Sequence, residues 1–113
     1  MKLVKFERSG AGEPGRPARV LEGNPTNLTW NITEDLDGEL VSGYWEAQPG
    51  KWEFEATAWE FCHIISGEVV LTTPDGVATT MKTGDAFVMR PGLKCTWDVK
   101  ETLLKHYVIL GSD

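Results

Sequence analysis

From residue 27 onward, the chain alternates between short runs rich in β-branched and aromatic residues and clusters of Gly, Pro, Asp and Asn. No segment shows a helical period, so this pattern favours β-strands joined by tight turns. Strands are expected at residues 28–33, 39–47, 52–56, 59–66, 68–73, 77–82, 86–89, 93–99 and 103–110. Many short strands at even spacing predict an all-β sandwich or barrel, of which the jelly roll is one kind.

Turn residues organise the rest of the chain. Pro74, Asp75 and Gly76 stand between two runs rich in Val, Leu and Thr, and they predict a β-hairpin. Residues 7–26 are rich in Gly and Pro and are expected to form loops. We therefore expect an N-terminal arm over residues 1–26, with a short strand near residues 1–6, and a barrel domain over residues 27–113.

Strand side chains alternate between two faces, which assigns residues to the barrel interior. One face of the run at 52–56 carries Trp52, Phe54 and Ala56. One face of the run at 93–99 carries Leu93, Cys95, Trp97 and Val99. In the run at 59–66, the expected inner face carries Glu60, Cys62 and Ile64, and the opposite face carries Trp59, Phe61, His63 and Ile65. A bulge near residues 56–60 would shift one face relative to the next.

Length and charge exclude several classes of function. The 113 residues suffice for one domain but not for two. The net charge of −6 comes without a basic patch, so nucleic acid and anionic membrane surfaces are not expected partners. No stretch is apolar enough to span a bilayer or to act as a signal peptide, so a cytoplasmic location with reduced Cys62 and Cys95 is expected.

Two segments resemble the conserved motifs of the cupin superfamily, whose fold is the double-stranded β-helix, a jelly-roll barrel. Glu60, separated from Gly67 by six residues, resembles the end of the first motif, and the segment from Gly84 and Asp85 to Pro91, Gly92 and Cys95 resembles the second. The segments at 44–52, 92–97 and 105–109 are similar to small single-domain members of the cupin family named after ureidoglycine aminohydrolase. The resemblance covers roughly residues 39–110.

The resemblance also implies where a cupin metal would bind. The usual three histidines and one glutamate fall on Phe54, Ala56, Glu60 and Cys95, and a proline of the second motif falls on Arg90. Phe54 and Ala56 have no donor atom, whereas zinc and iron sites generally need three or more protein ligands. We therefore expect no metal and no cofactor, and the chain departs from the aminohydrolase of the resembled family at the positions where that enzyme has metal ligands.

The candidate ligand-binding residues are those expected to line the barrel interior. They are Glu60, Cys62, Cys95, Trp97, Phe54, Ala56, Arg90 and His106. Burial would raise the pKa of Glu60 unless a cation such as Arg90 or Lys105 offset it. Both cysteines fit either core packing or a reactive thiol, and His106 would approach Cys95 only across strands. The five tryptophans fit core or dimer-interface positions better than a ligand cage, with Trp97 as the best candidate for a pocket wall.

Three functions remain open at this point. The first is a metal-independent barrel that binds a small molecule at its mouth. The second is an enzyme, either a hydrolase or isomerase on a small metabolite or a metalloenzyme with unusual ligands, and the third is a structural or regulatory dimer with a packed barrel. A homodimer is expected because the aromatic face that carries Trp59 and Phe61 needs a cover.

Overall fold

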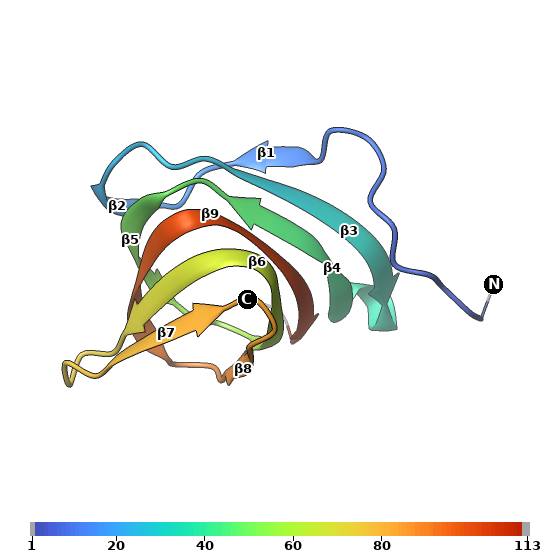
Figure 1. The fold of residues 1–113 in the computed structure, drawn as a ribbon. Helices are drawn as coiled ribbons and strands as arrows, with labels where there is room; N and C mark the ends of the chain where they lie inside the picture. The colour runs from blue at the N-terminus through green and yellow to red at the C-terminus, as the bar shows by residue number, and fades with distance from the viewer. Residues whose placement is uncertain (1, 112–113) are drawn as a thin grey trace.

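The computed structural model describes residues 2–111 and confirms the all-β prediction. Across this part of the chain, nine strands form one antiparallel sheet that curls into a barrel (Figure 1). The strands are β1 (Glu13–Gly15), β2 (Arg19–Glu22), β3 (Asn27–Asp35), β4 (Leu40–Ala47), β5 (Gly50–Glu55), β6 (Trp59–Thr72), β7 (Ala78–Lys82), β8 (Ala86–Met89) and β9 (Lys94–Leu110). A short 3₁₀ turn, Leu36–Gly38, links β3 to β4.

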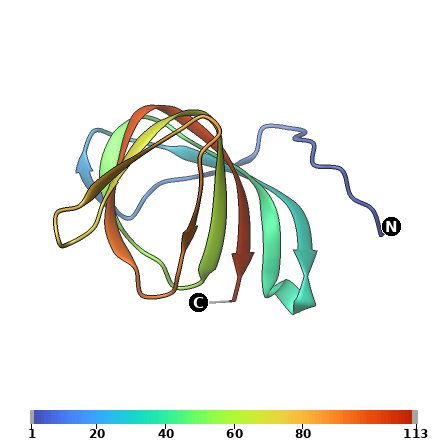
Figure 2. The same ribbon diagram turned by 60° about the horizontal axis from the view of Figure 1, so that its bottom comes forward.

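The long strand β9 organises the barrel. Its first half pairs with β5 and its second half with β4, while its other edge pairs with β6. Strand β6 in turn pairs with β8 near its start and with β7 near its end. Seen from a second direction, these curved strands surround a common interior (Figure 2). The inner faces of β4, β5, β6 and β9 therefore line that interior.

The structure joins strands that the sequence pattern separates. The runs expected at 59–66 and 68–73 form the single 14-residue strand β6, and those expected at 93–99 and 103–110 form the 17-residue strand β9. The pairing register of these two strands shifts around Ile64–Val69, where β6 bends. Gly67 has a positive φ of 94°, and a Cβ atom there would collide with the backbone carbonyl of Thr102. A glycine at this point lets both strands bend without breaking.

The turn predictions are confirmed in one place and corrected in another. The hairpin at residues 74–76 closes β6 onto β7, with the Gly76 amide donating to the Thr73 carbonyl over 2.9 Å. No bulge occupies residues 56–60, because β5 ends at Glu55 and β6 begins at Trp59. Ala56 instead bonds to the loop before β9: its amide donates to the Leu93 carbonyl, and its carbonyl accepts from the Gly92 amide.

The N-terminal segment differs from its sequence prediction. Residues 2–6 contain no strand, and Met1 lies outside the described residues. The expected loop at 7–26 contains β1, which pairs with β3, and β2, which pairs with β5. Both strands are short and largely exposed, so they follow the hydrogen-bonding edges of the sheet without an apolar pattern of their own.

The period-two assignment of faces is confirmed. The buried core contains Trp52 and Ala56 from β5 and its following loop, Cys62 and Ile64 from β6, and Cys95, Trp97 and Val99 from β9. The opposite side of β6, with Trp59, Phe61, His63 and Ile65, is only half buried. Alternation along the strands thus places one set of side chains in the barrel interior and the other set on a partly apolar outer surface.

Candidate ligand-binding cavity

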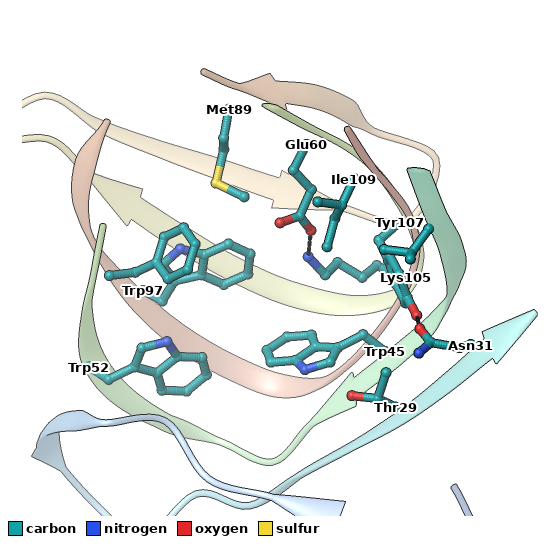
Figure 3. Close-up of a pocket in the computed structure, with 12 residues that line it drawn as sticks. Thr29, Asn31, Trp45, Trp52, Glu60, Met89, Trp97, Lys105, Tyr107 and Ile109 are labelled. Atoms are coloured by element: carbon teal, nitrogen blue, oxygen red, sulfur yellow. Dashed lines mark hydrogen bonds and ion pairs between the residues drawn. The ribbon is translucent and has the colours of Figure 1, made fainter. Parts of the chain in front are cut away.

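A cavity of about 310 Å³ opens inside the barrel. Its aromatic lining comes from Trp45, Trp52, Phe54 and Trp97, and its aliphatic lining from Val41, Met89 and Ile109. Its polar lining comes from Thr29, Asn31, Glu60, Lys105 and Tyr107 (Figure 3). The volume lies at the lower end of the range typical of small-molecule sites, about 300–1,000 Å³, so any ligand must be small.

Three tryptophans form one side of the cavity. Trp52 and Trp97, paired across β5 and β9, lie nearly parallel with ring centroids 6.2 Å apart. Trp45 from β4 meets both edge-on, at 6.3 Å from Trp52 and 5.9 Å from Trp97. These separations and angles match the favoured geometries of aromatic pairs. The tryptophans therefore fix one another and present flat, rigid faces to the cavity.

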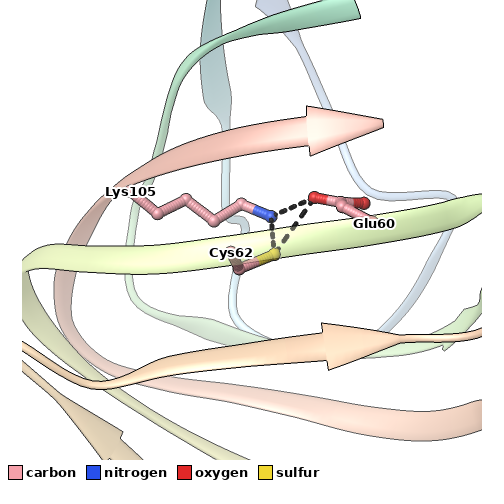
Figure 4. A network of polar contacts seen from close by, with 3 residues as sticks. All are labelled: Glu60, Cys62 and Lys105. Carbon is pink, nitrogen blue, oxygen red and sulfur yellow. Dashed lines mark hydrogen bonds and ion pairs between the residues drawn. The ribbon is translucent and has the colours of Figure 1, made fainter. Parts of the chain in front are cut away.

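A buried ion pair faces these tryptophans. The Lys105 ammonium on β9 donates to Glu60 Oε2 on β6 over 2.6 Å and to the Cys62 sulfur over 3.2 Å (Figure 4). The Cys62 thiol also lies 3.2 Å from Glu60 Oε2, to which it donates. The ammonium lies 4.9 Å from the Trp45 ring centre and 5.1 Å from that of Trp97, within cation–π range. Two hydrogen bonds and two aromatic faces thus compensate the burial of this lysine.

The pKa values of the cluster show which forms the barrel stabilises. Burial raises the pKa of the Cys62 thiol to about 12, although Lys105 partly opposes the rise. Burial alone would lower the pKa of the Lys105 ammonium, but Cys62 and Glu60 outweigh it and hold that pKa above its usual range. At neutral pH the cluster therefore contains an ammonium and a neutral thiol, and neither is a nucleophile in that form.

A second polar pair lies at another side of the cavity. The Tyr107 hydroxyl on β9 donates a hydrogen bond to Asn31 Oδ1 on β3. Burial raises the pKa of Tyr107 to about 12, so this hydroxyl stays protonated at neutral pH. The pair connects β9 with β3, which lie on either side of β4 in the sheet, and it adds no charge to the cavity.

The structure brings together four of the predicted site residues. Phe54, Glu60 and Trp97 line the cavity, and Cys62 lies directly behind Glu60 as part of the ion-pair cluster. The Glu60 side chain is only 13% exposed, so the prediction that it points into the barrel is confirmed. Its expected cationic partner is Lys105, not Arg90.

Four other predicted residues lie elsewhere. Ala56 is buried in the core beside the cavity, and Arg90 is exposed on the loop after β8. Cys95 borders a separate surface depression with Glu55 and Lys94. Burial raises the pKa of Cys95, and the neighbouring Trp97 indole lowers it to a smaller extent. That indole Nε1–H is buried without a hydrogen bond of normal geometry among the described residues.

His106 lies on the outer face of the barrel, which corrects its placement in the interior. Alternation along β9 points Lys105 and Tyr107 inward and His106 outward. There its Nδ1 lies 3.2 Å from Nδ1 of His63, its cross-strand partner, and its ring packs against Tyr44 at 4.8 Å. Burial, together with His63, lowers the pKa of His106. Neither histidine contributes to the cavity.

Sequence reasoning missed the contribution of Trp45, Trp52 and Tyr107 to the cavity. A signal was present at 103–109, where Lys105 alternates in phase with Leu103, Tyr107 and Ile109 on an otherwise apolar face. A lysine on a core face is rare unless a partner neutralises it. That pattern, combined with Glu60 on a neighbouring strand, predicts a buried ion pair.

The residues present do not fit the metal that the cupin resemblance implies. Phe54 and Ala56 occupy two of the four template positions and have no donor atom. Glu60 is already bound by the Lys105 ammonium, and Cys95 borders a different depression. Within residues 2–111, no three His, Cys, Asp or Glu side chains cluster closely enough to hold an ion. The Lys105 ammonium thus pairs with Glu60, which is the carboxylate at the usual glutamate position of the cupin metal site.

Comparison with known proteins identifies a family whose members resemble this chain. The model of the family described as "EutQ-like cupin domain" matches residues 33–107. No match is found among curated proteins. No helix within the described part of the chain is long and apolar enough to cross a membrane.

Solved structures share this architecture. A protein of unknown function of the DUF861 family from Pseudomonas syringae superposes with a TM-score of 0.82 at 25% identity, covering 92% of this chain and 46% of that one. This chain therefore spans less than half of the Pseudomonas protein. A DUF861 protein from Thermotoga maritima is 33% identical over 59% of this chain and 76% of its own, with a TM-score of 0.58. The Clostridium difficile EutQ protein shares the fold at 19% identity, over 79% of this chain and 71% of that one, with a TM-score of 0.67.

Proposed function

Because the chain belongs to the EutQ-like cupin domain family, we propose that it is a metal-independent cupin that binds one small molecule inside its barrel. The observation that carries this proposal is the cavity itself. It combines rigid tryptophan faces with an ion pair whose ammonium is satisfied by Glu60, Cys62 and two indole rings. Apolar surface for affinity and a few fixed polar groups for orientation are the usual composition of a small-molecule site.

The cavity favours binding over the other two functions left open by the sequence. A structural dimer with a packed barrel would not need an interior volume of about 310 Å³. An enzyme of the ureidoglycine aminohydrolase type would need an activated nucleophile or a metal. The raised pKa values of Cys62 and Lys105 argue against the nucleophile, and the donor set argues against the metal.

A thermal-shift screen of small metabolites in the presence of EDTA tests the proposal. A ligand at one hundred times its dissociation constant should add about 2.7 kcal/mol to the free energy of unfolding. The stabilisation should weaken in Trp45→Phe, which changes the cavity lining, and persist in Trp59→Phe, which changes the outer face of β6. If no compound stabilises the protein, or if hits act equally on both variants, binding inside the barrel is wrong.

A further inference from the structure

The two oxygens of Glu60 are not equivalent. Oε2 accepts hydrogen bonds from both the Lys105 ammonium and the Cys62 thiol. Oε1 accepts no hydrogen bond from the residues that the structure describes. It is also not among the unpaired polar atoms that are fully buried. Because Glu60 lines the cavity, Oε1 is a carboxylate oxygen open to whatever occupies it. An occupant that donates an N–H or O–H would complete the hydrogen bonding of this carboxylate.

Lys105, in contrast, has little left to offer a ligand. Its side chain is 6% exposed, and its ammonium is already engaged by Glu60, Cys62 and the faces of Trp45 and Trp97. An anionic ligand would therefore have to compete with Glu60 for this ammonium. Glu60 is the more exposed member of the pair, and its Oε1 offers the cavity an unused hydrogen-bond acceptor.

The charges of the cavity cancel. Lys105 and Glu60 form an ion pair, and Cys62 and Tyr107 are neutral at physiological pH. A charged ligand would lose its hydration and find no unpaired opposite charge among the described residues that line the cavity. The remaining lining is mainly aromatic and aliphatic, with Trp52 and Trp97 presenting nearly parallel rings. Flat, uncharged molecules fit these conditions best.

We infer that the cavity selects uncharged planar molecules that donate an N–H or O–H hydrogen bond to Glu60 Oε1, such as a primary carboxamide on an aromatic ring. This inference rests on the proposed binding function and adds the chemical class of the ligand. Metal and covalent chemistry play no part in it, because recognition depends on one charge-assisted hydrogen bond and on aromatic stacking.

Four probes of nearly the same shape separate these contributions. Benzamide is neutral and donates N–H bonds, acetophenone is neutral without a donor, benzoate is an anion, and benzamidinium is a cation. Calorimetric titration with EDTA present, together with tryptophan fluorescence, should show benzamide binding at least tenfold more tightly than each of the other three. Equal or tighter binding of benzoate, benzamidinium or acetophenone would overturn the inference while leaving the binding function intact.

A matched double variant tests the role of Glu60. Glu60→Leu with Lys105→Met removes both charges at similar volume, so the barrel should remain folded, as near-ultraviolet circular dichroism would show. Benzamide and acetophenone should then bind equally well. A preference for benzamide that survives in this variant would overturn the inference. Failure of all four probes at millimolar concentration would also overturn it, and the metabolite screen described above would decide separately whether the binding function stands.

Discussion

The ammonium of Lys105 lies 2.6 Å from Glu60 Oε2, with only 6% and 13% of the two side chains exposed. Glu60 occupies the one metal-ligand position of the cupin template at which this chain keeps the usual residue. The barrel therefore neutralises that carboxylate with a cation of its own sequence. The balance of charge inside the barrel depends on this pair, and so do the stability and the ligand preference that we predict.

Replacing Lys105 with methionine should destabilise the protein by about 3–5 kcal/mol, because Glu60 would remain buried without a cation. Urea unfolding measures this change. The control is Lys51→Met, since Lys51 lies 3.4 Å from Glu22 in an exposed pair and its loss should cost no more than about 0.5 kcal/mol. Equal effects of the two substitutions would show that the buried pair contributes no more than a surface pair.

Gly67→Ala should destabilise the protein far more than Gly84→Ala. Both glycines have positive φ angles, of 94° and 91°. A Cβ atom at Gly84 would meet no atom of the described residues within 4 Å, so its substitution should cost only the backbone strain of about 1–2 kcal/mol. At Gly67 the Cβ atom would also collide with the Thr102 carbonyl and force β6 and β9 apart, adding about 1–3 kcal/mol. Similar unfolding free energies for the two variants would mean that the strand bend tolerates a side chain.

Stability should fall as the pH rises from 9 to 12. The Cys62 thiol has an ordinary pKa of 9.0 in the unfolded chain and a pKa of about 12 in the barrel. In this window the unfolded chain loses a proton that the folded chain keeps, which lowers the free energy of unfolding by up to about 1.4 kcal/mol per pH unit. Cys62→Ser removes this thiol and should show a shallower loss between pH 9 and 10, below the range where Tyr107 contributes. Parallel pH profiles for wild type and Cys62→Ser would contradict this assignment.

We also propose that the outer face of β6 forms a homodimer interface. Phe61 lies between Val88 on β8 and Val108 on β9, and Trp59 pairs with Leu110, so apolar residues from three strands adjoin there. Val88 and Leu110 remain 43% and 46% exposed, which a second copy would cover. Light scattering should give a dimer for wild type and for the loop variant Val77→Glu, and a monomer for Phe61→Glu. A monomeric wild-type protein at micromolar concentration would refute the proposal.

The local pattern of the sequence predicts most of the barrel. Period-two alternation correctly places Trp52, Cys62 and Trp97 inside and His63 outside, because a slip of one residue would exchange the apolar and polar faces. The hairpin at residues 74–76 follows from its turn residues for a similarly local reason. The strands β1 and β2 were not predictable in this way, since they depend on free edges of β3 and β5.

The candidate site was predictable only where a single strand determines it. The spacing from Glu60 to Gly67 identifies the inward carboxylate, but its partner lies 45 residues further along the chain. The cavity joins side chains of β3, β4, β5, β6, β8 and β9, and their relative placement depends on how the sheet curls. Alternation along a strand predicts which face of the sheet carries each side chain, but not the position of that side chain along the barrel axis. For that reason Cys95, although buried on the inner side, lies away from Glu60.

Elemental analysis of the protein purified without chelators tests whether the barrel binds a transition metal. With Lys105 bound to Glu60, and Phe54 and Ala56 at two ligand positions, the barrel offers a transition metal too few donors. We expect iron, manganese, nickel and zinc far below one equivalent per chain. Near-stoichiometric content of any of these metals would contradict it.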